Sequence, residues 1–212
     1  MSTSARTQRM LRYAERALFA IGIIALAWFA SGQIYAAREQ AALSRELEAA
    51  RQAAETAAEA APDTRSAVSA APLAARALVG RIEVPRLRLS ALAREGVDVR
   101  TLRGSVGHVP GTALPGEPGN AAFAAHRDTF FRPLAGIRKG DTVLVTTPDG
   151  VHSYRVFGTR VVTPTEVSVL RSGQRSQLTL VTCYPFDYVG SAPQRFVVQA
   201  ELTPPPRAAA AQ

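Results

Sequence analysis

Two patterns of apolar and polar positions divide this chain of 212 residues into a helical part and a strand-rich part. Residues 17–37 carry no charged side chain, and about 20 apolar residues suffice for a helix to cross a bilayer. Residues 38–60 consist mainly of Ala, Glu, Gln and Arg, which favour helix. From residue 79 onward, short runs alternate between apolar and polar positions and stop at Gly or Pro, as β-strands do. The chain therefore predicts an N-terminal helix followed by a small all-β domain.

The charges beside the apolar segment predict how it crosses a membrane. Residues 1–16 carry four arginines against a single acidic residue, and basic residues collect on the cytoplasmic side of membrane spans. We expect residues 1–16 in the cytoplasm, residues 17–37 as an uncleaved transmembrane signal anchor, and the rest of the chain outside. A cleaved signal peptide is the alternative, because the densest apolar part, residues 18–30, has the length of one.

Residues 38–78 are predicted to form a stalk and linker. Apolar bulk in the helical part is confined to Leu43 and Leu47, so we expect no buried core there, and a coiled coil has little support. Over residues 60–77 the composition shifts to Ala, Ser and Pro, which is typical of a loose linker. Three prolines end the domain, and we expect the tail, residues 204–212, to be disordered.

The strand-rich part, residues 79–203, predicts roughly eight strands, which suits a small barrel or a sandwich. The turn Pro148-Asp149-Gly150 predicts a hairpin. A short helix is expected over residues 97–102, with Asp98 near its start, and a turn-rich stretch begins at Gly104. The strand predictions cover residues 80–84, 87–92, 120–125, 142–147, 151–162, 178–182 and 195–202.

Composition narrows the function classes. The net charge of +8 is carried almost entirely by arginine, but no basic run or interleaving of arginine with aromatic residues indicates a nucleic-acid partner. The single cysteine excludes an intramolecular disulfide. One cysteine and three scattered histidines have no metal-ligand spacing, so we expect neither a metal nor another cofactor.

The single cysteine is the main candidate for chemistry. Cys183 ends a predicted strand. The strand would hold the backbone of this residue in place, while the side chain at its end stays accessible as a nucleophile. The alternative is an inert core residue, because a free cysteine usually packs. His126 ends another apolar strand and could meet the thiol at the same rim, stabilise a thiolate and protonate a leaving amine. Arg195 would hold an oxyanion or a substrate carbonyl nearby.

The other two histidines are assigned to structural roles. His108 lies in the Gly- and Pro-rich stretch, where a polar loop role is expected. His152 lies in an alternating strand, and we expect it to face solvent.

Three segments resemble the sortases, a family of membrane-anchored cysteine transpeptidases. Thr179 to Arg195 (TLVTCYPFDYVGSAPQR) resembles the family signature around the reactive cysteine, and Asn120 to Asp128 (NAAFAAHRD) resembles the segment of the catalytic histidine. Gly80 to Pro85 (GRIEVP) resembles the opening strand. The Thr-Cys-Tyr-Pro-Phe string is most similar to class D or the related Gram-negative type.

The resemblance implies a closed eight-stranded β-barrel with short helices, preceded by a transmembrane helix and a helical stalk. It implies that Cys183 attacks an LPXTG-like sorting signal, that His126 exchanges protons with the leaving and incoming amines, and that Arg195 binds the substrate backbone or the oxyanion. Residues 161–170 fall where the family has its specificity loop, and Glu166 stands alone there, so we expect no calcium site. The substrate-binding candidates are Thr182, Ala124, Val162 and Leu170.

Three hypotheses about function follow. The first is a transpeptidase in the cytoplasmic membrane, with its catalytic domain in the periplasm or at the cell surface. It would join a protein with a sorting signal to an amine of peptidoglycan or of another envelope acceptor. The second is a thiol endopeptidase that hydrolyses its acyl intermediate. The third is a non-catalytic envelope barrel that binds sorting-like peptides.

Overall fold

The computed structural model describes residues 3–60 and 74–204, and it divides into two compact units, residues up to Arg38 and residues from Glu39 onward. Most of the predicted linker, residues 60–77, and nearly all of the predicted tail, residues 204–212, lie outside the described residues. The first unit is the beginning of helix α1, which runs from Thr3 to Ala60. In the described part of the chain, this is the one helix long and apolar enough to cross a membrane, with a mean hydropathy of 1.9 over 18 residues.

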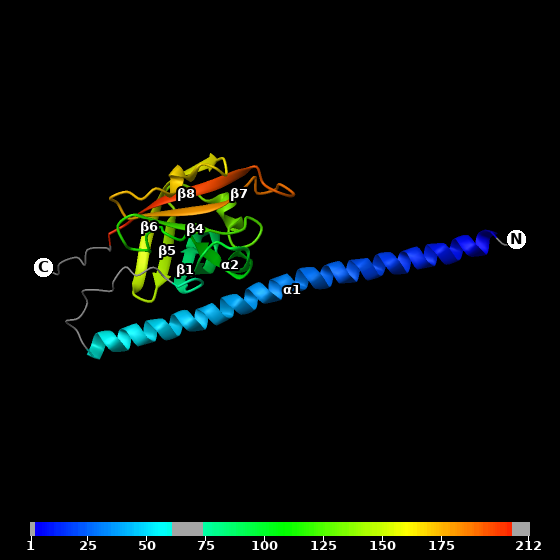
Figure 1. The fold of residues 1–212 in the computed structure, drawn as a ribbon, viewed down its shortest axis with the longest axis horizontal. Coiled ribbons are helices and arrows are strands. Elements are labelled where there is room, and N and C mark those ends of the chain that lie inside the picture. Colours follow the sequence, from blue (N-terminus) through cyan, green and yellow to red (C-terminus); the bar gives the residue numbers. More distant parts are fainter. Residues whose placement is uncertain (1–2, 61–73, 205–212) are drawn as a thin grey trace. The chain divides into compact units, whose positions relative to one another are not determined.

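Eight strands form a closed barrel in the second unit (Figure 1). The order around the barrel is β1-β2-β3-β4-β7-β8-β6-β5. The pairs β2–β3 and β4–β7 are parallel, and the other six pairs are antiparallel. The prediction of roughly eight strands is confirmed, and the barrel is the correct alternative to the sandwich. The strands are β1 (Leu78–Val84), β2 (Leu89–Glu95), β3 (Val106–His108), β4 (Asn120–Ala124), β5 (Thr142–Thr147), β6 (Gly150–Val162), β7 (Gln177–Tyr184) and β8 (Gln194–Leu202).

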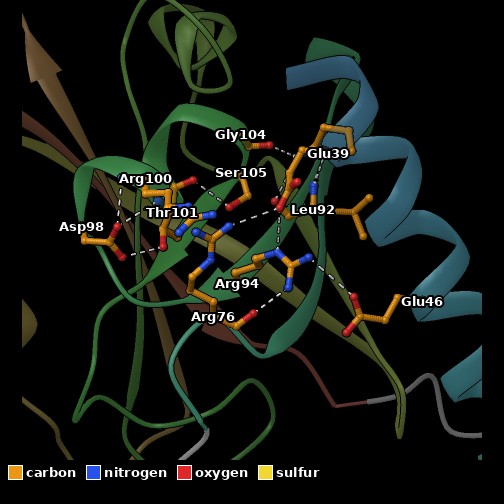
Figure 2. A network of polar contacts seen from close by, with 11 residues as sticks. Glu39, Glu46, Arg76, Leu92, Arg94, Asp98, Arg100, Thr101, Gly104 and Ser105 are labelled. Atoms are coloured by element: carbon orange, nitrogen blue, oxygen red, sulfur yellow. Dashed lines mark hydrogen bonds and ion pairs between the residues drawn. The ribbon is translucent and has the colours of Figure 1, made fainter. Parts of the chain in front are cut away.

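Four short helical segments connect these strands: α2 (Val99–Gly104) and the 3-10 helices η1 (Pro85–Leu87), η2 (Arg132–Gly136) and η3 (Val167–Leu170). The prediction of a helix near Asp98 is confirmed. The Asp98 carboxylate accepts hydrogen bonds from the backbone N–H groups of Arg100 (2.9 Å) and Thr101 (3.1 Å), as an N-cap should (Figure 2). The hydroxyl of Thr101 also donates to Asp98, and this bond is the main reason why the pKa of Asp98 is lowered.

Strand β3 lies inside the stretch that was predicted to be turn-rich, where no strand was expected. It has three residues, and it pairs in parallel with β2, where Gly107 is opposite Arg94. A Cβ atom at Gly107 would lie 2.3 Å from the carbonyl oxygen of Gly96, so only glycine allows this close approach. A strand this short depends on its partners more than on its own residue types, which explains why its sequence pattern does not reveal it.

Apolar side chains that alternate along the strands fill the barrel interior. Strand β5 contributes Val143 and Val145 to this core, and β7 contributes Leu178 and Leu180. Tyr154 on β6 is also fully buried, and its hydroxyl accepts a hydrogen bond from the backbone N–H of Gly116 at 2.7 Å. Burial raises the pKa of Tyr154. The largest fully buried apolar side chains in this core are Tyr154, Phe123, Phe131, Ile82, Leu134, Leu178 and Leu180.

The part of α1 that follows Glu39 packs against the barrel, which differs from the expectation of a stalk without a buried core. Leu43 is 0% exposed and Leu47 is 2% exposed, and both pack against Leu92 of β2. Gln40 pairs with the backbone of Leu92: its Oε1 accepts from the Leu92 N–H at 2.7 Å. Its Nε2 donates to the Gly104 carbonyl at 2.9 Å. Two leucines one helical turn apart and one glutamine therefore join the helix to the sheet, although two leucines are too few to predict that contact.

Charged side chains of α1 and the barrel form ion pairs near Leu92 (Figure 2). Glu39 of α1 lies 3.1 Å from Nε of Arg94 and 3.5 Å from Nη2 of Arg76. Arg94 also donates to the carbonyl of Arg76 at 2.6 Å and lies 3.7 Å from Glu46. The helix is thus held by a buried leucine pair with an ionic border.

Replacing Leu43 by alanine should destabilise the barrel, because it empties a fully buried site between the helix and β2. Large-to-small changes of this kind cost about 2–5 kcal/mol. The free energy of unfolding of the full chain in detergent, followed by near-ultraviolet circular dichroism, measures the effect. Glu48→Ala, at an exposed position of the same helix, is the control. Equal stabilities of the two variants would contradict the packing role of Leu43.

An ion pair outside the core joins η1 to the start of β5. The guanidinium of Arg86 donates to both carboxylate oxygens of Asp141, each at 2.6 Å. The backbone N–H of Arg138 donates to the same carboxylate at 2.8 Å. The Arg86 hydrogen bond is the main cause that holds the pKa of Asp141 below its ordinary value, and burial opposes it.

This depressed pKa predicts the acid sensitivity of the barrel. The contribution of Asp141 to stability is fully present above the pKa of an unfolded aspartate, about 3.9. It is lost as the pH falls through the lower pKa of the folded state. Asp141→Asn should therefore lower the free energy of unfolding at neutral pH and flatten its fall below about pH 4. Urea unfolding across the acid range tests this, with the exposed Asp149→Asn as control; wild-type and D141N curves that stay parallel would contradict it.

Candidate active site

The single cysteine and Arg195 are direct neighbours across two adjacent strands. Strands β7 and β8 are antiparallel and lie side by side (Figure 1), and their register places Cys183 opposite Arg195. Cys183 is the second-last residue of β7, and Arg195 is the second residue of β8. Because the two residues are paired near the ends of adjacent strands, the thiol and the guanidinium belong to the same end of the barrel.

The end of β4 brings His126 to that same place. Strand β4 runs parallel to β7, with Ala124 opposite Val181. The pairing continues past the end of β4, since the N–H of Ala125 donates to the Val181 carbonyl at 3.3 Å. The buried hydroxyl of Thr182 donates to the Ala125 carbonyl at 2.8 Å. His126 is the next residue after these contacts, and Cys183 is the next residue after Thr182, so both residues come directly after the same paired positions.

The three candidate residues are accessible. Cys183 and Arg195 are half-buried and His126 is exposed. The alternative of an inert core cysteine therefore has no support in the burial of Cys183. Nη1 of Arg195 donates hydrogen bonds to the carbonyls of Ala192 (3.2 Å) and Gln194 (3.0 Å). These bonds fix the orientation of the guanidinium. A thiol, an imidazole and a fixed cation at one rim can perform nucleophilic acyl transfer.

The other two histidines take structural positions, though not the expected ones. His108 is 2% exposed, and its two ring nitrogens lie 2.5 Å from Glu95 and 2.9 Å from the Ala113 carbonyl oxygen. The expectation of a polar loop residue was therefore wrong, because His108 ends strand β3 inside the fold. His152 is half-buried instead of facing solvent, and burial lowers its pKa. Its edge packs against Gly116, where a Cβ atom would come within 2.3 Å of the ring.

A largely apolar groove with a volume of about 240 Å³ opens beside Arg195. Its walls come from the ends of β4, β6, β7 and β8 and from the segment that includes η3. The predicted substrate-binding residues Ala124, Val162 and Leu170 all line this groove. Further lining residues are Val97, Val109, Val167, Val169, Val181 and Val197.

Thr182 does not belong to the groove lining. Its side chain is 2% exposed, and its hydroxyl is used by the bond to Ala125. The expectation that Thr182 contacts substrate is therefore replaced by a role in joining β7 to the segment that carries His126.

A buried asparagine, which the sequence reasoning missed, holds one wall of the groove. Asn120 is 1% exposed; its amide nitrogen donates to the Val169 carbonyl at 3.1 Å, and its amide oxygen accepts from the Thr179 hydroxyl at 2.8 Å. Its backbone N–H donates to the hydroxyl of Ser172 at 3.2 Å. The polar first residue of an otherwise apolar strand was the available signal. Asn120 thus ties the residues around η3 to β4 and β7.

The carboxylate of Glu166, at the rim of the groove, accepts a hydrogen bond from the Ser168 hydroxyl. This bond is the main reason why the pKa of Glu166 is lowered. Within residues 3–60 and 74–204, no group of three or more His, Cys, Asp or Glu side chains is arranged to hold a metal ion.

Known proteins share this fold. The sortase domain family matches residues 82–203, more than half of the chain, and the chain belongs to this family. Among characterised proteins it is similar to Sortase D of Bacillus subtilis (strain 168), with 33% identity over 120 residues, 56% of this chain and 61% of that protein. It is also similar to Sortase A of Listeria monocytogenes, with 31% identity over 130 residues, 59% of this chain and 57% of that protein. The match thus spans about three fifths of the length of these relatives.

Solved structures give the same result. A Clostridium perfringens Sortase D5 transpeptidase superposes with a TM-score of 0.55 at 26% identity, over 60% of this chain and 79% of that one. A Clostridium perfringens sortase C with the C-terminal cell wall sorting motif superposes with a TM-score of 0.57 at 28% identity, over 62% and 73%. The predicted family and the predicted barrel are confirmed.

Proposed function

We propose that this chain is a membrane-anchored cysteine transpeptidase that cleaves a sorting signal of the LPXTG type and transfers the acyl part to an amine. The observation that carries the proposal is the pairing of Cys183 with Arg195 across β7 and β8, next to the end of β4 where His126 follows. Membership of the sortase family supports it.

The first half of the reaction forms a thioester. The thiolate of Cys183 attacks the carbonyl carbon of the scissile peptide bond, and the carbonyl oxygen becomes an oxyanion as the C–S bond forms. Arg195 donates hydrogen bonds to this oxyanion or to the adjacent substrate backbone. The tetrahedral intermediate then collapses: the C–N bond breaks, and the imidazolium of His126 gives its proton to the leaving amine.

The second half of the reaction restores the enzyme. An incoming amine attacks the thioester carbon, loses a proton to the neutral His126, and displaces the thiolate of Cys183. A new amide bond replaces the one that was cleaved, so no cofactor or oxidant enters the balance. The amine belongs to peptidoglycan or to another envelope acceptor.

The groove beside Arg195 receives the sorting signal. Its valine-rich walls suit apolar side chains of an extended peptide, with Ala124, Val162 and Leu170 in contact with it. The sortase C of Clostridium perfringens has been solved with a C-terminal cell wall sorting motif, and we propose that this chain binds such a motif too.

The apolar part of α1 anchors the enzyme. Residues 17–37 span the cytoplasmic membrane, the basic residues 1–16 stay in the cytoplasm, and the barrel works on the outer side, in the periplasm or at the cell surface. The length and hydropathy of the helix support this placement.

Product analysis distinguishes transfer from hydrolysis. The full chain in detergent is incubated with a fluorogenic LPXTG-type peptide, with and without a glycine oligomer, and the products are separated by mass. We expect the ligated peptide only when the amine is present, and its share should rise with amine concentration. Hydrolysed peptide alone at every concentration of several amines would favour the thiol endopeptidase.

A further inference from the structure

Arg127, the residue after His126, binds the loop that joins β7 to β8, the strands that carry Cys183 and Arg195. We call residues 185–193 the β7–β8 loop. Nη1 of Arg127 donates to the carbonyl of Pro185 at 2.9 Å, and Nη2 donates to the carbonyls of Tyr188 and of Gly190, the latter at 3.1 Å. The guanidinium also lies 5.8 Å from the centre of the Tyr188 ring, within the range of a cation–π contact.

The far part of this loop has little packing of its own. Tyr188 is 47% exposed and Val189 is 94% exposed. Gly190 has a φ of +97°, which lets the chain turn back toward β8. A planar guanidinium that binds three carbonyls can hold such a segment in one conformation, because its donors point in fixed directions.

The contacts of Arg127 form one of two ties on either side of His126. On one side, the hydroxyl of Thr182 is bound to the carbonyl of Ala125. On the other side, Arg127 is bound to the carbonyl of Pro185. Their partners Thr182 and Pro185 likewise lie on either side of Cys183 along the chain.

We infer that Arg127 is a positioning residue of the active site: it holds the β7–β8 loop against the segment of His126, and so aligns His126 with Cys183 and Arg195. This inference rests on the proposed transpeptidase function. Arg127 acts through backbone carbonyls of the loop and not through the substrate. Its loss should therefore lower kcat with little change in KM, since misplacing reacting groups by about 1 Å costs on the order of 100-fold in rate.

Three variants of the full chain in detergent test the inference, each assayed with the sorting-motif peptide that the wild type turns over fastest. Arg127→Ala should lose about 10- to 100-fold in kcat with KM changed by less than about threefold. Arg127→Lys should recover part of the loss, because an ammonium keeps the charge but not the planar fork. Arg132→Ala, at an exposed arginine in η2, is the matched control and should keep the wild-type rate.

The outcomes separate the inference from the proposed function. A wild type that neither cleaves nor transfers any peptide overturns the proposed function, and the inference with it. An active wild type with Arg127→Ala equal to Arg132→Ala in kcat overturns the inference alone. A loss confined to KM would do the same, since it would place Arg127 in contact with the substrate. If Arg127→Ala does not fold, Arg127→Lys carries the test, with a reduced kcat expected and an unchanged kcat overturning the inference.

Discussion

Cys183→Ala should abolish both cleavage and transfer of a sorting-signal peptide while the barrel stays folded. The expected loss is at least about 1,000-fold in kcat, because the reaction has no other nucleophile and the covalent route is closed. Cys183 is the only thiol of the chain, so no neighbouring cysteine can replace it. The cleavage rate of a fluorogenic peptide by Cys183→Ala, compared with that of the wild type at equal protein concentration, measures the loss.

The folded state of this variant must be verified separately. Cys183 is half-buried near the end of β7, and removing one sulfur atom from such a position should change the free energy of unfolding by about 1 kcal/mol or less. Near-ultraviolet circular dichroism and the unfolding midpoint provide this check. Cys183→Ala protein that is folded and still turns over peptide above the background rate would remove the thiol from the mechanism.

Arg195→Lys should also lose most of the activity, although it keeps the positive charge. Nη1 of Arg195 is occupied by the carbonyls of Ala192 and Gln194, so the fixed guanidinium leaves its other donors for the substrate. A lysine has a point charge on a flexible stem, and it cannot provide both sets of hydrogen bonds in this geometry. Loss of an oxyanion donor typically costs about 100- to 1,000-fold in kcat, and we expect a fall of this size.

A matched substitution on the surface controls for the change of arginine to lysine itself. Arg175 is 77% exposed and lies 3.3 Å from Glu201, so Arg175→Lys should leave kcat unchanged. Near-normal turnover by Arg195→Lys would show that a point charge suffices, and it would contradict the role assigned to the guanidinium fork.

Local patterns made much of the fold predictable. The apolar alternation of β1, the hairpin around Pro148-Asp149-Gly150 and the short helix with Asp98 near its start all depend on a few neighbouring residues of the chain, and all three predictions match the structure. Strand ends were also visible in the sequence. Because buried strands fix the position of the residues that follow them, reading His126 and Cys183 as strand-end residues led to the same rim of the barrel.

The contacts that the sequence did not reveal are those between distant segments. In the sequence, Leu43 and Leu47 are isolated apolar residues of a predicted stalk. In the structure, both pack against Leu92, about 50 residues further along the chain. The pairing of His108 with Glu95 depends on the parallel register of β2 and β3, and no local pattern indicates a three-residue strand.

The polar residues behind the site were hidden for the same reason. Arg127 binds carbonyl groups about 60 residues further along the chain, and backbone acceptors leave no trace in residue types. The hydrogen bond between Asn120 and Thr179 forms only because β4 pairs with β7. The residues to which we assign the chemistry were predicted from strand ends and from family resemblance, whereas the residues that we propose to position them became visible only in the structure.

In the proposed transpeptidation, Cys183 forms a thioester with a sorting-signal peptide. Intact-mass analysis tests it most directly: the full chain in detergent is incubated with LPXTG-type peptides, quenched in acid, and digested to locate any adduct. We expect Cys183 to carry an added mass equal to the acyl part of the peptide. This adduct should disappear when a glycine oligomer is added, and it should be missing in Cys183→Ala. No adduct with any sorting-motif variant, together with a Cys183 that resists small thiol reagents, would contradict it.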